Sequence, residues 1–149
     1  MESSIKKKIE FYCAYQERCH YDVSNKLNKL GVFGNEVDEY ICYLIDENYL
    51  SETRYSEAFI RGKFNNNNWG RIKIIRELKM RNISEWNINN ALKQIDEKDY
   101  EKKLNKICEK QIQHISGSSS EIRNKVIRYL TQKGWETDLI IKCINRPTK

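Results

Sequence analysis

The chain has 149 residues and a formal net charge of +6; 39% of its residues are hydrophobic, 32% are charged, and the mean hydropathy is −0.81. This composition favours an elongated helical array with much solvated surface over a compact globule, and the longest apolar run, 40–45, is too short to span a bilayer. Five irregularly spaced cysteines and the lack of an apolar signal segment predict a cytoplasmic protein with reduced thiols and no membrane partner.

The first fifty residues predict three helices. A first helix is indicated by apolar residues that recur four positions apart, namely Ile5, Ile9 and Cys13. A second helix over 23–30 ends at Gly31, because glycine readily takes the left-handed conformation that closes a helix. Asn35 is then placed to cap a third helix.

The rest of the chain repeats this order twice. We expect helices over 55–64, 69–81 and 85–95, and again over 100–114, from Ser118 to Gly134, and over 138–144. Asn82 and Gly134 take the stop position of Gly31, since asparagine is the non-glycine residue that best tolerates the left-handed conformation. Ser84 is placed to cap one helix, and Ser118 with Glu121 has capping-box spacing for another.

One helical pattern therefore occurs three times, at a spacing of 51 to 52 residues. The aligned positions are Leu27, Leu78 and Leu130; Gly31, Asn82 and Gly134; Val32, Ile83 and Trp135; and Val37, Ile88 and Ile140. A fixed period of this length indicates stacked supersecondary units. We predict an all-α fold of three tandem three-helix repeats in an elongated array. It forms a single domain over 1–149, with repeats over about 5–50, 51–97 and 98–145.

Positive charge is concentrated in the middle of the chain. Residues 54–81 carry eight basic and two acidic side chains, whereas residues 1–53 carry six and ten. Such a block indicates an anionic partner, either nucleic acid or an acidic protein surface, and a solvated helix face is the competing interpretation. In the helix that begins near Arg71, one face is expected to be apolar through Ile72, Ile74, Ile75 and Leu78. Burying that face would leave an outward basic ridge of Arg71, Lys73 and Arg76.

Trp69 opens this basic helix, between the asparagine segment 65–68 and the dipeptide Gly70–Arg71. Two roles fit its position. It packs into the protein, or it forms an exposed platform beside Arg71 and Lys73 on which a base or a partner's surface can stack.

No catalytic, metal-binding or nucleotide-binding pattern occurs in the sequence. Cys13 and Cys19 lie six residues apart and cannot share one face of a helix, while Cys108 and Cys143 are predicted to be small core residues. Neither a phosphate-binding glycine loop nor a nucleophile or zinc motif is present. We therefore expect a protein that is not an enzyme and has no cofactor, metal ion or small-molecule substrate.

The segment Glu47–Ser84 resembles the central repeat of RecX-type regulatory proteins. The matching positions are Arg54, Tyr55, Ala58, Phe59, Arg61, Lys63, Trp69, Gly70, Ile72, Glu77, Leu78, Ile83 and Ser84. Residues 11–31 and 122–144 are similar to the first and third repeats of the same family, so the resemblance covers nearly the whole chain. In this comparison, Asn82 stands where the family commonly has glycine.

The resemblance implies a curved rod of three three-helix repeats. It also implies a non-enzymatic regulator that binds the RecA recombinase and its filament on DNA, and that modulates, mainly inhibits, recombination and DNA repair. The residues expected to bind this partner are Arg54, Tyr55, Arg61, Lys63, Trp69, Arg71, Lys73 and Arg76. The alternative is a helical DNA-binding module, for example of helix-turn-helix type, that acts directly on nucleic acid through the same basic segment.

Overall fold

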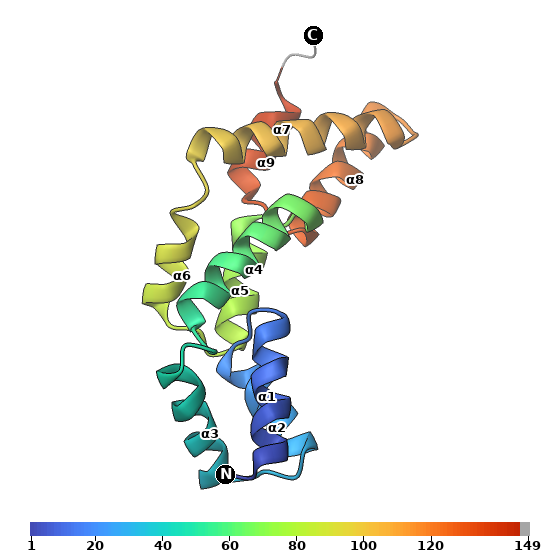
Figure 1. Ribbon diagram of the computed structural model, residues 1–149. Helices are drawn as coiled ribbons and strands as arrows, with labels where there is room; N and C mark the ends of the chain where they lie inside the picture. The colour runs from blue at the N-terminus through green and yellow to red at the C-terminus, as the bar shows by residue number, and fades with distance from the viewer. Residues whose placement is uncertain (147–149) are drawn as a thin grey trace. The chain divides into compact units, whose positions relative to one another are not determined.

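The computed structural model describes residues 1–146, which form nine α-helices and no β-strand (Figure 1). The helices are α1 (Ser3–Tyr15), α2 (His20–Lys29), α3 (Asn35–Asp46), α4 (Glu52–Asn67), α5 (Arg71–Met80), α6 (Glu85–Leu92), α7 (Glu97–His114), α8 (Ser119–Gln132) and α9 (Thr137–Ile144). They follow one another as three successive sets of three. The all-α fold of tandem three-helix repeats predicted from the sequence is confirmed for this part of the chain.

The three sets share one helix-ending motif. The residue two positions after the second helix of each set has a positive φ: +89° at Gly31, +58° at Asn82 and +92° at Gly134. The next backbone N–H returns to the carbonyl of the leucine five residues back, over 2.9 Å from Val32 to Leu27, 3.1 Å from Ile83 to Leu78 and 3.1 Å from Trp135 to Leu130. All three leucines are fully buried, so the aligned positions have equivalent environments and the repeat is confirmed.

Capping explains where several helices begin. Ser84 Oγ accepts the N–H of Asn87 at 3.2 Å, and Ser118 Oγ accepts the N–H of Glu121 at 3.2 Å, as the sequence predicted. The expectation for Asn35 is wrong, because Gly34 holds the cap position and Asn35 is already the first helical residue.

The structure shifts the bounds of several predicted helices. Helix α2 starts at His20 rather than 23, and α7 starts at Glu97 rather than about 100. Helix α4 starts at Glu52 rather than 55, because Ser51 Oγ accepts the N–H of Arg54 at 3.2 Å. Helix α5 starts at Arg71 rather than 69, because Asn68 has a φ of +60°. Helix α6 ends at Leu92 rather than 95.

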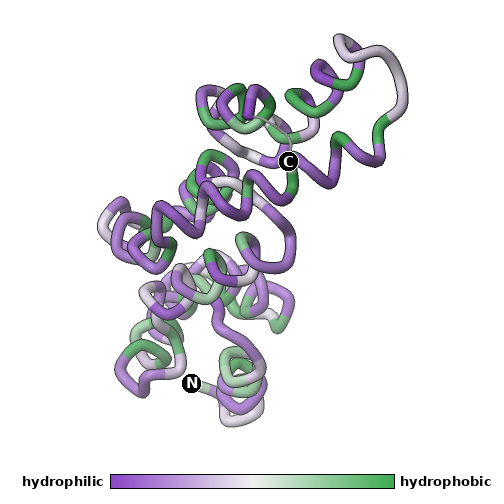
Figure 2. The backbone as a smooth tube through the Cα atoms, turned by 90° about the horizontal axis from the view of Figure 1, so that it is seen from above, coloured by the Kyte–Doolittle hydropathy of each residue, from purple (hydrophilic) through white to green (hydrophobic). Residues whose placement is uncertain are grey.

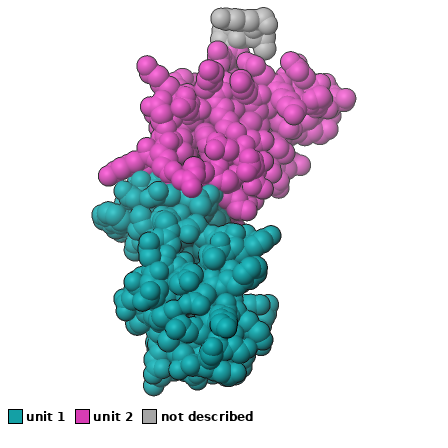
Figure 3. All heavy atoms as spheres, in the orientation of Figure 1, with its two compact units in different colours: residues 1–59, 78–91 teal, residues 60–77, 92–149 magenta. Residues whose placement is uncertain are grey.

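The chain divides into two compact units, unit 1 with residues 1–59 and 78–91 and unit 2 with residues 60–77 and 92–149 (Figure 3). The division passes through α4 and α5, and so differs from the repeat boundaries expected near residues 50 and 97, which stay a prediction. In Figure 2, hydrophilic and hydrophobic positions alternate around the helices, as they do when a helix buries one face.

Unit 1 is built around α2, which packs against both α1 and α3. One cluster of its buried side chains consists of Ile9, Cys13, Val23, Leu27, Val32, Val37, Tyr40, Leu44 and Leu50. Unit 2 has α7, α8 and α9 packed against one another around an aromatic group. In that group the ring centroid of Tyr100 lies 4.6 Å from that of Trp135 and 5.9 Å from that of Phe64. No helix among the described residues is long and apolar enough to cross a membrane.

Candidate partner-binding site

The predicted binding residues belong to both units. Arg54 and Tyr55 lie in unit 1, and the other six lie in unit 2. Arg54 holds the start of α4 to neighbouring segments: its Nε donates to Glu17 Oε2 at 2.8 Å, and its Nη1 and Nη2 donate to the side chain and carbonyl of Asn48 at 2.7 and 2.9 Å. Tyr55 is buried, and this desolvation raises the pKa of its hydroxyl. Both residues therefore have structural roles.

Arg71 is held inside unit 2 by two carboxylates. Its Nη2 lies 2.7 Å from Glu136 Oε2 and its Nη1 lies 2.8 Å from Glu97 Oε2, while the guanidinium carbon lies 3.8 Å from the ring centroid of Tyr100. Partial burial lowers the pKa of Arg71, but the hydrogen bonds to Glu97 and Glu136 outweigh burial and raise the pKa above its usual value. The expectation that Arg71 belongs to an outward ridge is wrong.

The helical period explains the error. Arg71 precedes Ile74, Ile75 and Leu78 by three, four and seven positions, which is the spacing of one helix face. Arg71 therefore shares the face of Ile74 and Leu78, both fully buried. Ile72, which was expected on that face, lies about 200° away from Ile74 at 100° per residue and is 49% exposed.

A close backbone approach fixes the start of α5. The N–H of Gly70 donates to Lys133 O at 2.8 Å, and the N–H of Ile72 donates to Gly134 O at 3.0 Å. A Cβ on Gly70 would lie 2.5 Å from Gly134 O, and a Cβ on Gly134 would collide with the backbone of α5. Only glycine fits at either position, so the segment that precedes α5 is held in one place.

This anchoring places Trp69 between two lysines. Its ring centroid lies 4.8 Å from Lys63 Nζ and 4.4 Å from Lys73 Nζ, and the backbone N–H of Trp69 donates to Lys63 O at 3.0 Å. The preceding residue, Asn68, accepts a hydrogen bond from Trp135 Nε1 at 3.0 Å. Trp69 is half-buried, and is thus neither a core residue nor an open platform.

A basic hollow of about 450 Å³ lies between the second half of α4 and α7, within unit 2. Arg61 of the predicted set lines it, and its Nη1 donates to Gln94 Oε1 at 2.9 Å. The other cations that line it are Lys102, Lys103 and Lys106, which were not among the residues predicted from the sequence. Their signal was present in the sequence, because Lys102 and Lys106 are four residues apart and so share a helix face.

Lys103 is the most constrained of these cations. Its Nζ donates to Asn65 O at 3.3 Å and lies 5.1 Å from the ring centroid of Phe64. Partial burial, together with the neighbouring charge of Lys106, lowers the pKa of Lys103. An anion in the hollow would relieve this repulsion, so the arrangement suits a phosphate or a carboxylate. Asp96 and Asp99 also line the hollow and limit its net positive charge.

The described residues contain no group of three or more histidine, cysteine or acidic side chains that could hold a metal ion. All five cysteines are free thiols. Cys108 and Cys143 are buried, as predicted for small core residues, and Cys42 on α3 is the exposed one.

Two family models match consecutive parts of the chain. Residues 51–92 match the RecX second three-helix domain, and residues 99–144 match the RecX third three-helix domain. Regulatory protein RecX of Oceanobacillus iheyensis is 26% identical over 136 residues, which cover 91% of this chain and 50% of that protein. Regulatory protein RecX of Pseudomonas savastanoi pv. phaseolicola is 25% identical over 127 residues, which cover 85% of this chain and 81% of that protein. The chain thus spans only half the length of the Oceanobacillus relative.

Solved structures show the same arrangement of helices. RecX from Lactobacillus salivarius superposes with a TM-score of 0.81 at 26% identity, over 95% of this chain and 93% of that one. A second structure, of a regulatory protein RecX, gives a TM-score of 0.86 at 20% identity, over 97% and 73% of the two chains, and supports the fold alone. Since both family models fall on successive helix triplets and the relatives align along most of the sequence, the chain belongs to the RecX family of regulatory proteins.

Proposed function

We propose that this chain is a non-enzymatic regulator that binds RecA filaments on DNA and lowers the activity of the recombinase. Family membership supports a regulatory role, and the RecA partner follows from the resemblance of the central segment. The observation that carries the proposal is the charge of unit 2, where eighteen basic side chains stand against nine acidic ones. A surface of this sign suits a filament that contains nucleic acid.

The proposed contact surface differs from the set expected from the sequence. Arg54, Tyr55 and Arg71 stabilise the fold, so we assign the contact to exposed cations of unit 2, namely Arg61, Arg76, Lys102 and Lys106. Lys63 and Lys73 contribute through Trp69, whose indole they flank. The second candidate function, direct binding of DNA without RecA, is favoured by the same cations, because they suit phosphates equally well.

Cosedimentation separates the two functions. The chain is mixed with RecA filaments assembled on single-stranded DNA, and in parallel with the same DNA alone. Tighter binding to filaments, together with slower strand exchange or ATP turnover by RecA, supports the proposal. Equal affinity for bare DNA and for filaments, with no effect on RecA, would favour the DNA-binding module instead.

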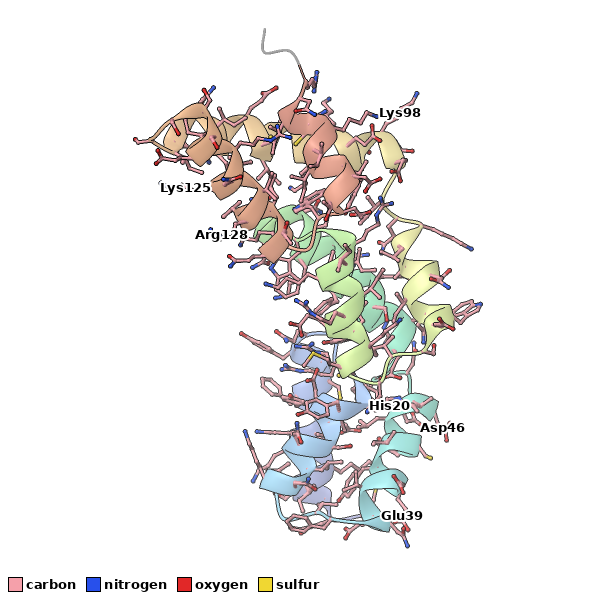
Figure 4. All side chains as sticks on the ribbon, turned by 180° about the vertical axis from the view of Figure 1, so that it is seen from behind. His20, Glu39, Asp46, Lys98, Lys125 and Arg128 are labelled. Atoms are coloured by element: carbon pink, nitrogen blue, oxygen red, sulfur yellow. The ribbon has the colours of Figure 1, made fainter. Side chains whose placement is uncertain are left out.

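Charge reversal tests the location of the contact. Arg61→Glu, Arg76→Glu and Lys102→Glu are combined in one variant, and Lys98→Glu, Lys125→Glu and Arg128→Glu in a control of identical charge. Figure 4 labels the three control positions, near the start of α7 and on α8, and all six side chains are exposed. We expect the first variant alone to lose filament binding. Equal loss in both variants would mean diffuse electrostatic attraction without a defined surface.

A further inference from the structure

A second candidate surface lies on α1 and α2, within unit 1, and the central basic segment has no part in it. An open hollow of about 490 Å³ lies along these helices. Aromatic rings and cations line it, and none of its lining residues is acidic. We call it the α1–α2 surface; its residues are Lys7, Lys8, Phe11, Tyr12, Tyr15, Arg18 and Lys26.

Two aromatic rings of this surface are left open to solvent. Phe11 is 70% exposed and Tyr15 is 73% exposed, and they lie one helical turn apart on α1. Their ring centroids are 6.4 Å apart with an interplanar angle of 36°. Large exposed apolar side chains that cluster, rather than occurring singly, indicate an interaction surface.

The cations of the surface surround a third ring. The guanidinium carbon of Arg18 lies 3.7 Å from the ring centroid of Tyr12, and its Nε donates to Tyr12 O at 2.9 Å. Lys26 Nζ lies 5.6 Å from the same centroid on the side of α2. Lys7 and Lys8 are exposed on α1. Arg18 is therefore fixed by its contacts with Tyr12, while the two lysines are exposed to solvent.

The acidic residues nearest in sequence are bound elsewhere. Glu10 accepts a hydrogen bond from the hydroxyl of Tyr43 on α3, and Glu17 pairs with Arg54 on α4. Asp22 accepts the N–H of Cys19 at 3.3 Å, as part of the capping of α2. The cations of the α1–α2 surface form no ion pair among the described residues, so their charge is available to a ligand.

The positive charge of the α1–α2 surface contrasts with the net negative charge of unit 1. Unit 1 as a whole carries nine basic and twelve acidic side chains. A cluster of four cations without a lining carboxylate is thus a local arrangement and does not follow from the net charge. Exposed ring faces and unneutralised cations together match a ligand that presents both planar bases and phosphates.

We propose that the α1–α2 surface binds single-stranded nucleic acid, with bases stacked on Phe11 and Tyr15 and phosphates held by Lys7, Lys8 and Arg18. A duplex fits less well, because its bases are stacked inside and offer no face to the rings. An acidic protein segment would use the cations, but it would leave the exposed ring pair without a role. The inference does not depend on RecA.

The test measures binding of a fluorescently labelled oligothymidylate by anisotropy, with the full chain and without RecA. Phe11→Ala combined with Tyr15→Ala should weaken binding by about 25-fold or more, since each stacked base contributes a factor of roughly 5 to 150. The matched control removes two exposed rings elsewhere in unit 1, Phe33→Ala and Trp86→Ala, and should bind like the original chain. Circular dichroism checks that both variants keep their helices.

Two further measurements sharpen the result. Lys7→Ala combined with Lys8→Ala should reduce the slope of log affinity against log salt by about 1 to 1.5, because fewer counterions are released. A duplex of the same length should bind more weakly than the single strand. The proposal is overturned if the ring variant binds as tightly as the original chain, or if polyglutamate displaces the oligonucleotide as well as unlabelled oligothymidylate does. Filament cosedimentation is scored separately, so failure here leaves the proposed RecA regulation standing.

Discussion

Arg71 shows how a charged residue becomes part of a partly buried network of interactions. It shares a helix face with Ile74 and Leu78, and Glu97 and Glu136 neutralise it at the end of that face. Replacing Arg71 with Met would leave the half-buried Glu136 without its cation. We expect this change to lower the free energy of unfolding by about 1–3 kcal/mol.

The matched control is Arg76→Met, on the same helix but exposed, which should change the free energy of unfolding by less than about 0.5 kcal/mol. Urea denaturation of both variants measures the difference. Equal changes in the free energy of unfolding would show that the ion pairs of Arg71 with Glu97 and Glu136 contribute nothing to stability.

The same ion pair predicts a pH dependence. The hydrogen bond from Arg71 lowers the pKa of Glu97 below its ordinary value of 4.5. The unfolded chain therefore takes up the proton first, and the stability from this pair is present above pH 4.5 and lost as pH falls through the lower pKa of the folded state. Glu97→Gln should lose this part of the acid dependence, as urea midpoints between about pH 6 and pH 3 can measure. An unchanged acid profile would contradict the assignment.

Leu78 tests the repeat at a single buried side chain. It is fully buried and accepts the closing hydrogen bond of its helix through its carbonyl. Leu78→Ala should cost about 2–5 kcal/mol, whereas Met80→Ala, two residues away and 67% exposed, should cost little. Thermal or urea unfolding measures both. A similarly small loss of unfolding free energy in both variants would mean that the core around Leu78 repacks and leaves no costly cavity.

At the scale of helices, the three glycines Gly31, Gly62 and Gly134 separate two effects. Gly31 and Gly134 both have a positive φ, but a Cβ would meet nothing within 4 Å at Gly31 and would collide with Lys73 at Gly134. Gly31→Ala should cost about 1 kcal/mol from backbone strain alone, and Gly134→Ala should cost more. Gly62 lies inside α4 with open space around it, so Gly62→Ala should stabilise by about 0.5–1 kcal/mol. Equal losses at Gly31 and Gly134 would contradict the close approach to α5.

Periodicity predicted the number, order and type of the helices, because each second helix is followed by a glycine or asparagine with positive φ and has a buried leucine four residues before that position. Helix bounds were less well predicted where a local hydrogen bond decides them, as with the cap at Ser51 and the left-handed Asn68. The candidate site was predicted in part. Arg61, Lys73 and Arg76 follow from the basic block, but the paired state of Arg71 depends on carboxylates 26 and 65 residues away, which no local pattern reveals.

At the scale of the whole molecule, the two units carry net charges of opposite sign. Unit 1 has a net charge of −3 and unit 2 of +9, which together give the +6 of the chain. Binding to a filament through unit 2 should therefore weaken steeply with salt. The variant with Arg61, Arg76 and Lys102 changed to Glu should have a shallower slope of log affinity against log salt, by about 2–3, if these residues touch phosphates. Cosedimentation at several salt concentrations measures it, and an unchanged slope would mean that these cations do not contact DNA.

The distribution of the cysteines makes the unmodified chain suitable for labelling. Burial raises the pKa of the Cys13 and Cys19 thiols to about 11, which leaves little thiolate to react at neutral pH. Cys108 and Cys143 are buried, whereas Cys42 is exposed on α3, a helix that contributes no residue to either proposed binding surface. A maleimide dye should therefore attach at Cys42 alone. Such a probe would report the arrival of a RecA filament or an oligonucleotide at the chain with every native side chain of both surfaces in place.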